Sequence, residues 1–191
     1  MSKIKAGVAM CGSFCTFKEV FPVIKDLKSK DFDIVPIMSH NAYSTDTRFG
    51  SAEEMRQRFE EISGKEIIHT ITEAEPIGPK KLLDILIIIP CTGNTLAKLA
   101  TGIADTAVTL AAKSHLRNQR PVLIGISTND ALAGAAKNIG LLQNYKNVYF
   151  IPYNQDDSVN KPTSIVADFS KTYEAAIAAL AGKQIQPILT S

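Results

Sequence analysis

The stretch from Leu82 to Lys113, LLDILIIIPCTGNTLAKLATGIADTAVTLAAK, holds the pattern that decides the fold. Its segment Ile85–Ile89 is apolar throughout and mostly β-branched, which predicts a strand buried on both faces and ended by Pro90. Small and polar residues, Cys91–Thr95, follow at once, and an alanine-rich helical run comes after them. A buried strand with such an ending is typical of a ligand-binding edge in an α/β sheet.

The rest of the chain repeats this alternation of strand-like and helix-like runs. Short apolar runs predict further strands at Ile4–Met10, Asp33–Met38, Lys65–His69, Pro121–Ile126 and Val148–Ile151. Apolar residues at helical spacing predict helices at Thr16–Lys28, Ala52–Ile62, Leu96–Lys113 with a break near Gly102, Asp130–Leu142 and Ile165–Leu180. We therefore predict an α/β fold with a three-layer, doubly wound parallel sheet, in a single domain over residues 1–191.

Composition narrows the class of protein. The 21 basic and 19 acidic residues nearly balance, and without a basic cluster we expect no nucleic-acid partner. The three cysteines are an odd number and follow no signal peptide, which favours a reducing cytoplasm over a disulfide framework. Their spacing is not that of a zinc ribbon, so we expect no metal. No run reaches the roughly 18 apolar residues of a membrane span.

Polar residues at the predicted strand ends suggest where a ligand binds, because ligands of open parallel sheets lie at the carboxyl ends of the strands. Four such ends are rich in Ser, Thr, Asn and Gly and carry no Lys or Arg: Cys11–Thr16, Ser39–Thr45, Cys91–Thr95 and Ser127–Asp130. Hydroxyls and backbone N–H groups bind phosphate without a formal cation, so together they predict an anion site. Each end alone is also explained by helix N-caps.

Several common sites are excluded by the same residues. The first loop has only Gly12 and no GxGxxG fingerprint, and no acidic residue follows the second strand, which argues against a conventional NAD site. No GxxxxGK[ST] stretch occurs, which excludes a P-loop. His40 lies at a strand end and is a candidate ligand contact, whereas His69 and His115 fit surface or structural positions. The sequence identifies no catalytic residue.

One motif has a family resemblance. Pro90–Thr95, PCTGNT, resembles the PASANT motif of the homo-oligomeric flavin-containing Cys decarboxylase superfamily, and Leu96–Asp105 resembles that superfamily's KIAxGIADNL helix. The resemblance extends over nearly the whole chain. It implies a Rossmann-like flavoprotein fold and an FMN cofactor. It also implies a homo-oligomer, either a trimer or a dodecamer built from trimers, with the flavin near the subunit interface.

The resemblance also implies which residues hold the flavin. All lie at the four strand ends: Gly12, Ser13, Ser39, Thr92, Gly93, Asn94, Thr95, Ser127 and Asn129. Two long loops, 39–51 and 153–164, each carry a cation. Arg48 and Lys161 are, by position, candidates for holding a substrate carboxylate.

Two departures from the superfamily pattern bear on the chemistry. Its decarboxylases carry a His in an HIxL-like segment before the central strand, where this chain reads Glu75–Pro79, EPIGP. They also carry PxMNxxMW after the next strand, where this chain reads Ile126–Ala133 and only Asn129 keeps its place. We therefore expect cysteine decarboxylation to be lost.

A narrower resemblance lies within this superfamily, to an oxidoreductase subunit of spore-forming bacteria. It rests on AGVAMCGSFCTF, ISTNDALAGAAKNIG and YFIPYNQDDSVNKPTSIVAD. It implies an enzyme subunit that acts with a separate A subunit to oxidise a small dihydro-type dicarboxylate, with FMN here, or NADP or NAD through the A subunit, as hydride acceptor. Two alternatives stay open: a binding or assembly subunit with a vestigial flavin site, and a residual FMN-dependent decarboxylase.

Overall fold

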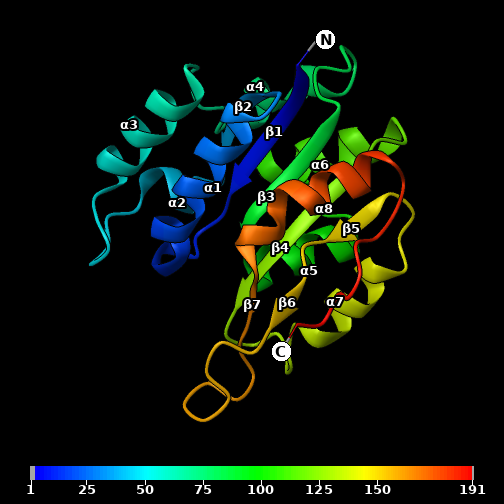
Figure 1. Cartoon of the computed structure of the whole chain (residues 1–191). Helices are drawn as coiled ribbons and strands as arrows, with labels where there is room; N and C mark the ends of the chain where they lie inside the picture. The colour runs from blue at the N-terminus through cyan, green and yellow to red at the C-terminus, as the bar shows by residue number, and fades with distance from the viewer. Residues whose placement is uncertain (1–2, 191) are drawn as a thin grey trace.

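The computed structural model describes residues 3–190, in which one seven-stranded sheet is flanked by helices (Figure 1). Five strands are parallel and lie in the order β2-β1-β3-β4-β5. They are β1 (Ile4–Met10), β2 (Phe32–Met38), β3 (Ile85–Cys91), β4 (Val122–Thr128) and β5 (Val148–Phe150). This order is that of a doubly wound sheet, and the predicted fold class is confirmed.

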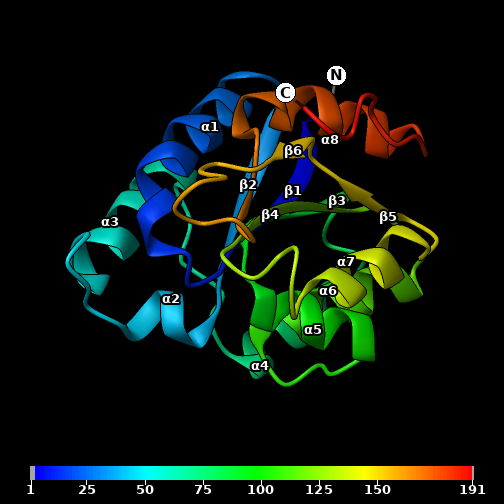
Figure 2. The same ribbon diagram turned by 90° about the horizontal axis from the view of Figure 1, so that it is seen from below.

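Helices cover both faces of the sheet and give the three predicted layers. Figure 2 shows two of them on one face, α1 (Phe17–Ser29) and α8 (Thr172–Leu180). The other face carries α5 (Gly93–Thr101), α6 (Ala107–Arg117) and α7 (Ala136–Gln143). Three more helices follow β2 along the chain: α2 (His40–Ser44), α3 (Ala52–Ser63) and α4 (Ile71–Ala74). Short 3₁₀ turns are η1 (Phe14–Thr16), η2 (Glu75–Ile77) and η3 (Phe169–Lys171).

β3 is the central strand, and all of its residues are buried because it lies between β1 and β4 under both helical layers. The prediction that Pro90 ends this strand is wrong, since β3 continues to Cys91. The pairing register with β4 shifts between Ile88 and Cys91. Such an irregularity accommodates a proline, which has no N–H to give to the ladder.

The predicted helix Ile165–Leu180 is wrong in its first half. Residues Ile165–Ala167 form β7, which runs antiparallel to the end of β4 and to β6 (Tyr153–Asn154). β5 pairs only with residues 122–124 of β4, so the rest of that edge is open to β7. The apolar residues of β7 and α8 share one helical spacing, but the pairing of β7 with distant strands decides its conformation.

The predicted helix Asp130–Leu142 begins only at Ala136. The backbone N–H of Leu132 donates to Thr163 O at 3.0 Å, and those of Ala133 and Ala135 donate to Asp130 O. The loop between β6 and β7 thus satisfies the Leu132 N–H, and residues 130–135 form hydrogen-bonded turns in place of the first helical turn. This loop extends beyond the carboxyl end of the sheet (Figure 1).

The remaining sequence predictions concern shorter segments. The alanine-rich run divides as predicted, since Gly102 caps α5 with a φ of +74°. Lys65–His69 forms no strand; within it only Ile68 makes a bridge, to Ile37 of β2. None of the helices over residues 3–190 is long and apolar enough to cross a membrane. The single domain over residues 1–191 stays a prediction.

Candidate functional site

Two cavities open at the carboxyl ends of the parallel strands and share two residues, Gly12 and Thr92. The larger, of about 690 Å³, is also lined by the predicted residues Ser13, Arg48, Ser127, Asn129 and Lys161. The smaller, of about 510 Å³, is also lined by the predicted residues Ser39, Asn94 and Thr95. The fold thus gathers residues from four separate strand ends, and places them in two neighbouring hollows.

The larger cavity joins the loop after β1 to the end of β4. The hydroxyls of Ser13 and Ser127 lie 2.7 Å apart. Ser13 precedes η1, but its hydroxyl does not cap that turn. These two hydroxyls are therefore not explained as helix caps, and each keeps hydrogen-bonding capacity for a ligand.

In the smaller cavity two hydroxyls do act as helix N-caps. Ser39 Oγ accepts from Ala42 N at 3.3 Å, and Thr92 Oγ1 accepts from Thr95 N at 3.5 Å. The N-cap explanation is therefore correct for Ser39 and Thr92, although both also line the cavity. A hydroxyl has two acceptor lone pairs and one donor, so capping does not exhaust it.

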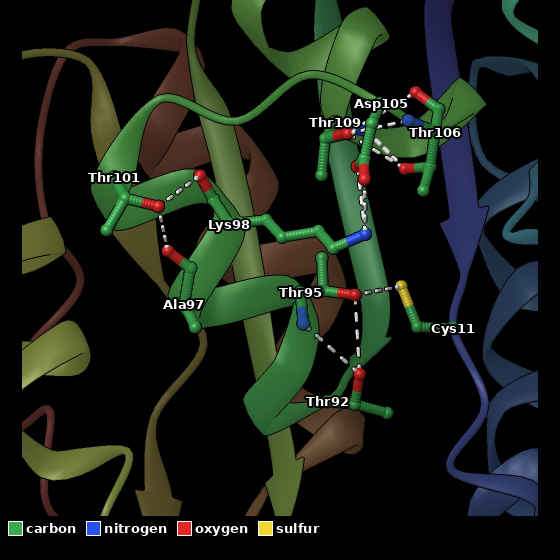
Figure 3. A network of polar contacts seen from close by, with 9 residues as sticks. All are labelled: Cys11, Thr92, Thr95, Ala97, Lys98, Thr101, Asp105, Thr106 and Thr109. Atoms are coloured by element: carbon green, nitrogen blue, oxygen red, sulfur yellow. Dashed lines mark hydrogen bonds and ion pairs between the residues drawn. The ribbon is translucent and has the colours of Figure 1, made fainter.

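Two buried thiols, Cys11 and Cys91, lie close to Thr95 and Thr92 respectively. Thr95 Oγ1 donates to Cys11 Sγ at 3.3 Å and lies 3.3 Å from Thr92 Oγ1 (Figure 3). The pKa of Cys11 is lowered, chiefly by a hydrogen bond from Cys91 and in part by the one from Thr95, against the opposing effect of burial. Burial raises the pKa of Cys91 well above its usual value. Both thiols are buried, and neither lines the two cavities.

The cation of the smaller cavity is neutralised within the chain. Lys98 extends from α5 to Asp105 and reaches its two carboxylate oxygens at 2.8 and 2.9 Å (Figure 3). Hydrogen bonding and the charge of Lys98 lower the pKa of Asp105. Neither residue was predicted as a site residue, although both belong to the segment that resembles the superfamily helix.

Gly93 is the predicted site residue that lines neither cavity. A Cβ at this position would lie 2.7 Å from Asp130 Oδ1 and 2.9 Å from Thr128 Oγ1. Thr128 in turn donates to Asp130 at 2.6 Å. Close packing of α5 against the end of β4 therefore accounts for the glycine, and a direct contact with a cofactor stays a prediction.

The larger cavity is the more highly charged. Its lining includes three cations, Lys18, Arg48 and Lys161, and two carboxylates, Glu19 and Asp156. Lys161 pairs with Asp156 at 3.2 Å. Lys18, from α1, was missed by sequence reasoning because a lone lysine on a helix carries no motif.

Asn129, another predicted site residue, uses two of its hydrogen-bond acceptors on the loop between β6 and β7. Its backbone oxygen accepts from Thr163 Oγ1 at 2.6 Å, and its side-chain oxygen accepts from Ser164 Oγ at 3.4 Å. The side-chain NH₂ remains available to the cavity. Asn129 therefore holds the loop in place as well as lining the cavity.

The three histidines lie apart. His40 lines the smaller cavity, as expected for a candidate contact. The ring of His69 stacks on Tyr43 with centroids 3.7 Å apart, and His115 is buried at the opposite end of the sheet. Over residues 3–190 no group of three or more His, Cys, Asp or Glu side chains is arranged to hold a metal ion.

Comparison with known proteins gives a consistent result. Residues 1–177 match the Flavoprotein family. The chain is 43% identical over 192 residues to the dipicolinate synthase B subunit of Bacillus subtilis (strain 168), and this match covers 99% of the chain and 96% of the relative.

Solved structures agree with the sequence comparison. The crystal structure of the dipicolinate synthase B subunit from Bacillus halodurans C superposes with a TM-score of 0.91 at 40% identity, over 100% of this chain and 99% of that one. A dodecameric FMN-dependent Ubix-like decarboxylase from Escherichia coli O157:H7 matches with a TM-score of 0.64 at 22% identity, over 78% and 80%. The second likeness concerns the fold alone.

Proposed function

This chain belongs to the Flavoprotein family, and on that premise we propose that it acts as the B subunit of a dipicolinate synthase. In this role it works with an A subunit to oxidise a dihydrodipicolinate-type precursor to dipicolinic acid during sporulation. The observation that carries the proposal is the likeness to two B subunits over nearly the full length of both chains. The activity is that of an oxidoreductase subunit.

FMN is the proposed cofactor, and the residues at the carboxyl edge fit it. Two adjoining hollows of about 690 and 510 Å³ offer hydroxyl, amide and backbone donors from four strand ends. Such donors suit a phosphate monoester and a polyhydroxyl chain. The residues that would hold FMN are Gly12, Ser13, Ser39, Thr92, Asn94, Thr95, Ser127 and Asn129. A bound flavin supplies an acceptor for the hydride that leaves the substrate.

The protein's own contribution is to bind and orient the substrate. Arg48 and Lys161 line the larger cavity, which supports their proposed role in holding a dicarboxylate. A guanidinium binds a carboxylate through two parallel hydrogen bonds, which fixes the orientation of the ligand as well as its position. A nearby Asp156 keeps the charge of Lys161 balanced until the ligand arrives.

The wider setting follows from the same proposal. The A subunit is the protein partner and brings NADP or NAD if the hydride passes on to a nicotinamide. The protein is a homo-oligomer, a trimer or a dodecamer, in the cytoplasm of the mother cell of a sporulating bacterium. The likeness to the two B subunits supports the partnership with an A subunit.

A second candidate is a non-catalytic binding or assembly subunit with a vestigial flavin site. It is favoured by the two departures from the decarboxylase pattern, at Glu75–Pro79 and Ile126–Ala133. Residues Glu75–Ile77 form the short turn η2, and a histidine is absent from this segment. The same departures argue against a residual FMN-dependent decarboxylase.

Co-purification with an A subunit, followed by a dipicolinate assay with and without added FMN and NADP, tests the proposal. We expect a yellow protein that releases FMN on heating, and synthesis that needs both subunits. Full synthesis by the A subunit alone would refute the need for this chain. A colourless protein that takes up no FMN but is still required for synthesis would favour the assembly subunit. Carbon dioxide release from a cysteine substrate would favour the decarboxylase.

A further inference from the structure

The segment Thr45–Ser51, here called the strap, connects α2 to α3 and carries Arg48 at its tip. Its backbone closes on itself, since Thr47 N donates to Gly50 O at 3.0 Å and Gly50 N donates to Thr47 O at 3.1 Å. Phe49 N also donates to Thr47 Oγ1 at 3.1 Å. The strap is therefore a hydrogen-bonded turn with a defined shape, unlike an irregular surface loop.

The strap is also fastened to the helix that follows. Ala52 N donates to Asp46 Oδ1 at 2.8 Å, and Ser51 with Glu54 forms a capping box at the start of α3. Gly50 has a φ of +139°, a backbone conformation that residues with a side chain rarely adopt. This construction positions the two tip residues before a ligand arrives, which reduces the entropy lost on binding.

The tip side chains face the larger cavity without an ionic partner from the chain. Both Arg48 and Phe49 line that cavity, and the guanidinium lies over the Phe49 ring, 4.9 Å from its centroid. Over residues 3–190 Arg48 takes part in no ion pair within 4.0 Å, while 46% of Phe49 is exposed. A guanidinium that lies over an aromatic ring and has no carboxylate partner keeps its N–H groups free to bind an anion.

The other charges around the cavity point to an anion as that ligand. Lys161 is already paired with Asp156, which also bonds to Ser164. Lys18 lies on α1 at the same cavity, and also makes no ion pair with residues 3–190. Lys18 and Arg48, together with the Phe49 ring, therefore line one hollow of about 690 Å³, whose three cations outnumber its two carboxylates, Glu19 and Asp156.

We propose that Arg48 and Phe49 form the specificity-determining pair for an aromatic ring that bears carboxylates. The guanidinium binds one carboxylate through two hydrogen bonds, and the Phe49 ring packs against the ring of the ligand. Lys18, together with Lys161, supplies the positive charge for a second carboxylate. The identification of the ligand as pyridine-2,6-dicarboxylate, or its dihydro precursor, rests on the proposed function.

Substitution of Arg48 can show whether its guanidinium binds the substrate carboxylate or the FMN phosphate. Hydroxyl and backbone donors at the strand ends account for an FMN phosphate without Arg48, so the guanidinium is left for the substrate. Loss of Arg48 should then weaken the binding of the dicarboxylate and leave the binding of FMN unchanged. If Arg48 instead holds the phosphate, both affinities fall together.

The test is equilibrium titration of the full chain with pyridine-2,6-dicarboxylate, pyridine-2-carboxylate and FMN. For Arg48→Gln we expect dicarboxylate binding to weaken about 10- to 100-fold, the usual effect of removing a hydrogen-bonded charge. Phe49→Leu should weaken it about 3- to 10-fold. The matched control is Arg58→Gln, because Arg58 also lies over a phenylalanine ring, that of Phe21 at 4.5 Å, but lines neither cavity.

The inference is overturned if Arg48→Gln, with the melting temperature of the native chain, binds the dicarboxylate as the native chain does. It is equally overturned if FMN affinity falls as much as dicarboxylate affinity, or if the native chain binds neither pyridine carboxylate. Synthesis with the A subunit distinguishes the two proposals. If dicarboxylate binding depends on Arg48 but the native chain supports no synthesis, this inference is supported and the proposed function is refuted. If Arg48→Gln supports synthesis at the native rate, the proposed function is supported and this inference is refuted.

Discussion

The two ends of the parallel sheet differ in whether their polar groups line cavities or bond to other parts of the chain. At the carboxyl end, hydroxyls from four strand ends and cations from α1, α5 and two loops surround two cavities. At the amino end, the chain uses its own polar groups: Asn118 Nδ2 donates to Gly78 O at 2.8 Å, and Arg120 donates to Leu83 O. The carboxyl end is the proposed ligand-binding end, whereas the polar groups of the amino end hold the chain together. Substitutions should therefore change ligand binding at the first end and stability at the second.

The largest expected effect is an acid sensitivity caused by His115 at the amino end. This side chain is 2% exposed, and its Nε2 has no hydrogen-bond partner among residues 3–190. Burial, assisted by the charge of Arg120, lowers the pKa of His115 from 6.5 to about 4. Between these values the unfolded chain binds the proton and the folded chain does not, so the free energy of unfolding decreases as the pH falls from about 6.5 to about 4. The loss is about 3 kcal/mol over that window.

Chemical denaturation at pH 7.5 and pH 4.5 measures this effect. In His115→Gln, which has no titrating ring, the drop in the free energy of unfolding between the two pH values should be smaller by about 2 kcal/mol. An equal drop in both proteins would show that other groups cause the acid sensitivity.

Next in size is Gly78→Ala, also at the amino end. A Cβ there would lie 2.8 Å from Ser114 Cβ and 3.0 Å from Arg117 Nη2. Overpacking of this kind costs about 1–3 kcal/mol, which denaturation can detect. The control is Gly140→Ala in α7, where a Cβ meets nothing within 4 Å and the helix should gain about 0.5–1 kcal/mol. FMN affinity should stay unchanged in both variants; a loss in Gly78→Ala alone would break the contrast between the two ends.

At the carboxyl end, Gly12→Ala should affect the ligand more than the fold. A Cβ there would lie 3.4 Å from Phe14 Cε2, an ordinary contact, and Gly12 lines both cavities. We expect the free energy of unfolding to change by less than about 1 kcal/mol and FMN to bind about tenfold more weakly. Flavin fluorescence titration provides the measurement. If Gly12→Ala binds FMN as tightly as the native chain does, the flavin does not contact Gly12, which lines both cavities.

The smallest effect concerns Cys15, the exposed thiol of the larger cavity. Cys11 and Cys91 are buried, so a thiol reagent should modify one of the three cysteines in the native chain and all three after unfolding. Cys15→Ser should abolish the native reaction and change stability by less than about 0.5 kcal/mol. Rapid native modification of two or more thiols would mean that the carboxyl end opens more readily than its packing indicates.

Much of the fold could be predicted from local patterns. The limits of β1 and the start of α3 agree with the sequence prediction, because a buried strand and a capped amphipathic helix each have a local signal. β7 could not be found in this way, because Ile165–Ala167 is a strand only through its pairing with β4 and β6. The turn before α7 likewise bonds to Thr163, which is distant in the sequence and could not be inferred from a local pattern.

The candidate site also combines local features that the sequence shows with distances that only the fold sets. The sequence by itself determined that four strand ends are small, polar and free of cations, since that is a local property of the chain. Only the tertiary structure decided that these ends form two cavities, that Asp130 packs against Gly93 and that Asp105 neutralises Lys98. It also placed Arg48 in the same hollow as Ser127, 79 positions further along the chain. Pairing of strands and closure of loops set such distances, and no local pattern encodes them.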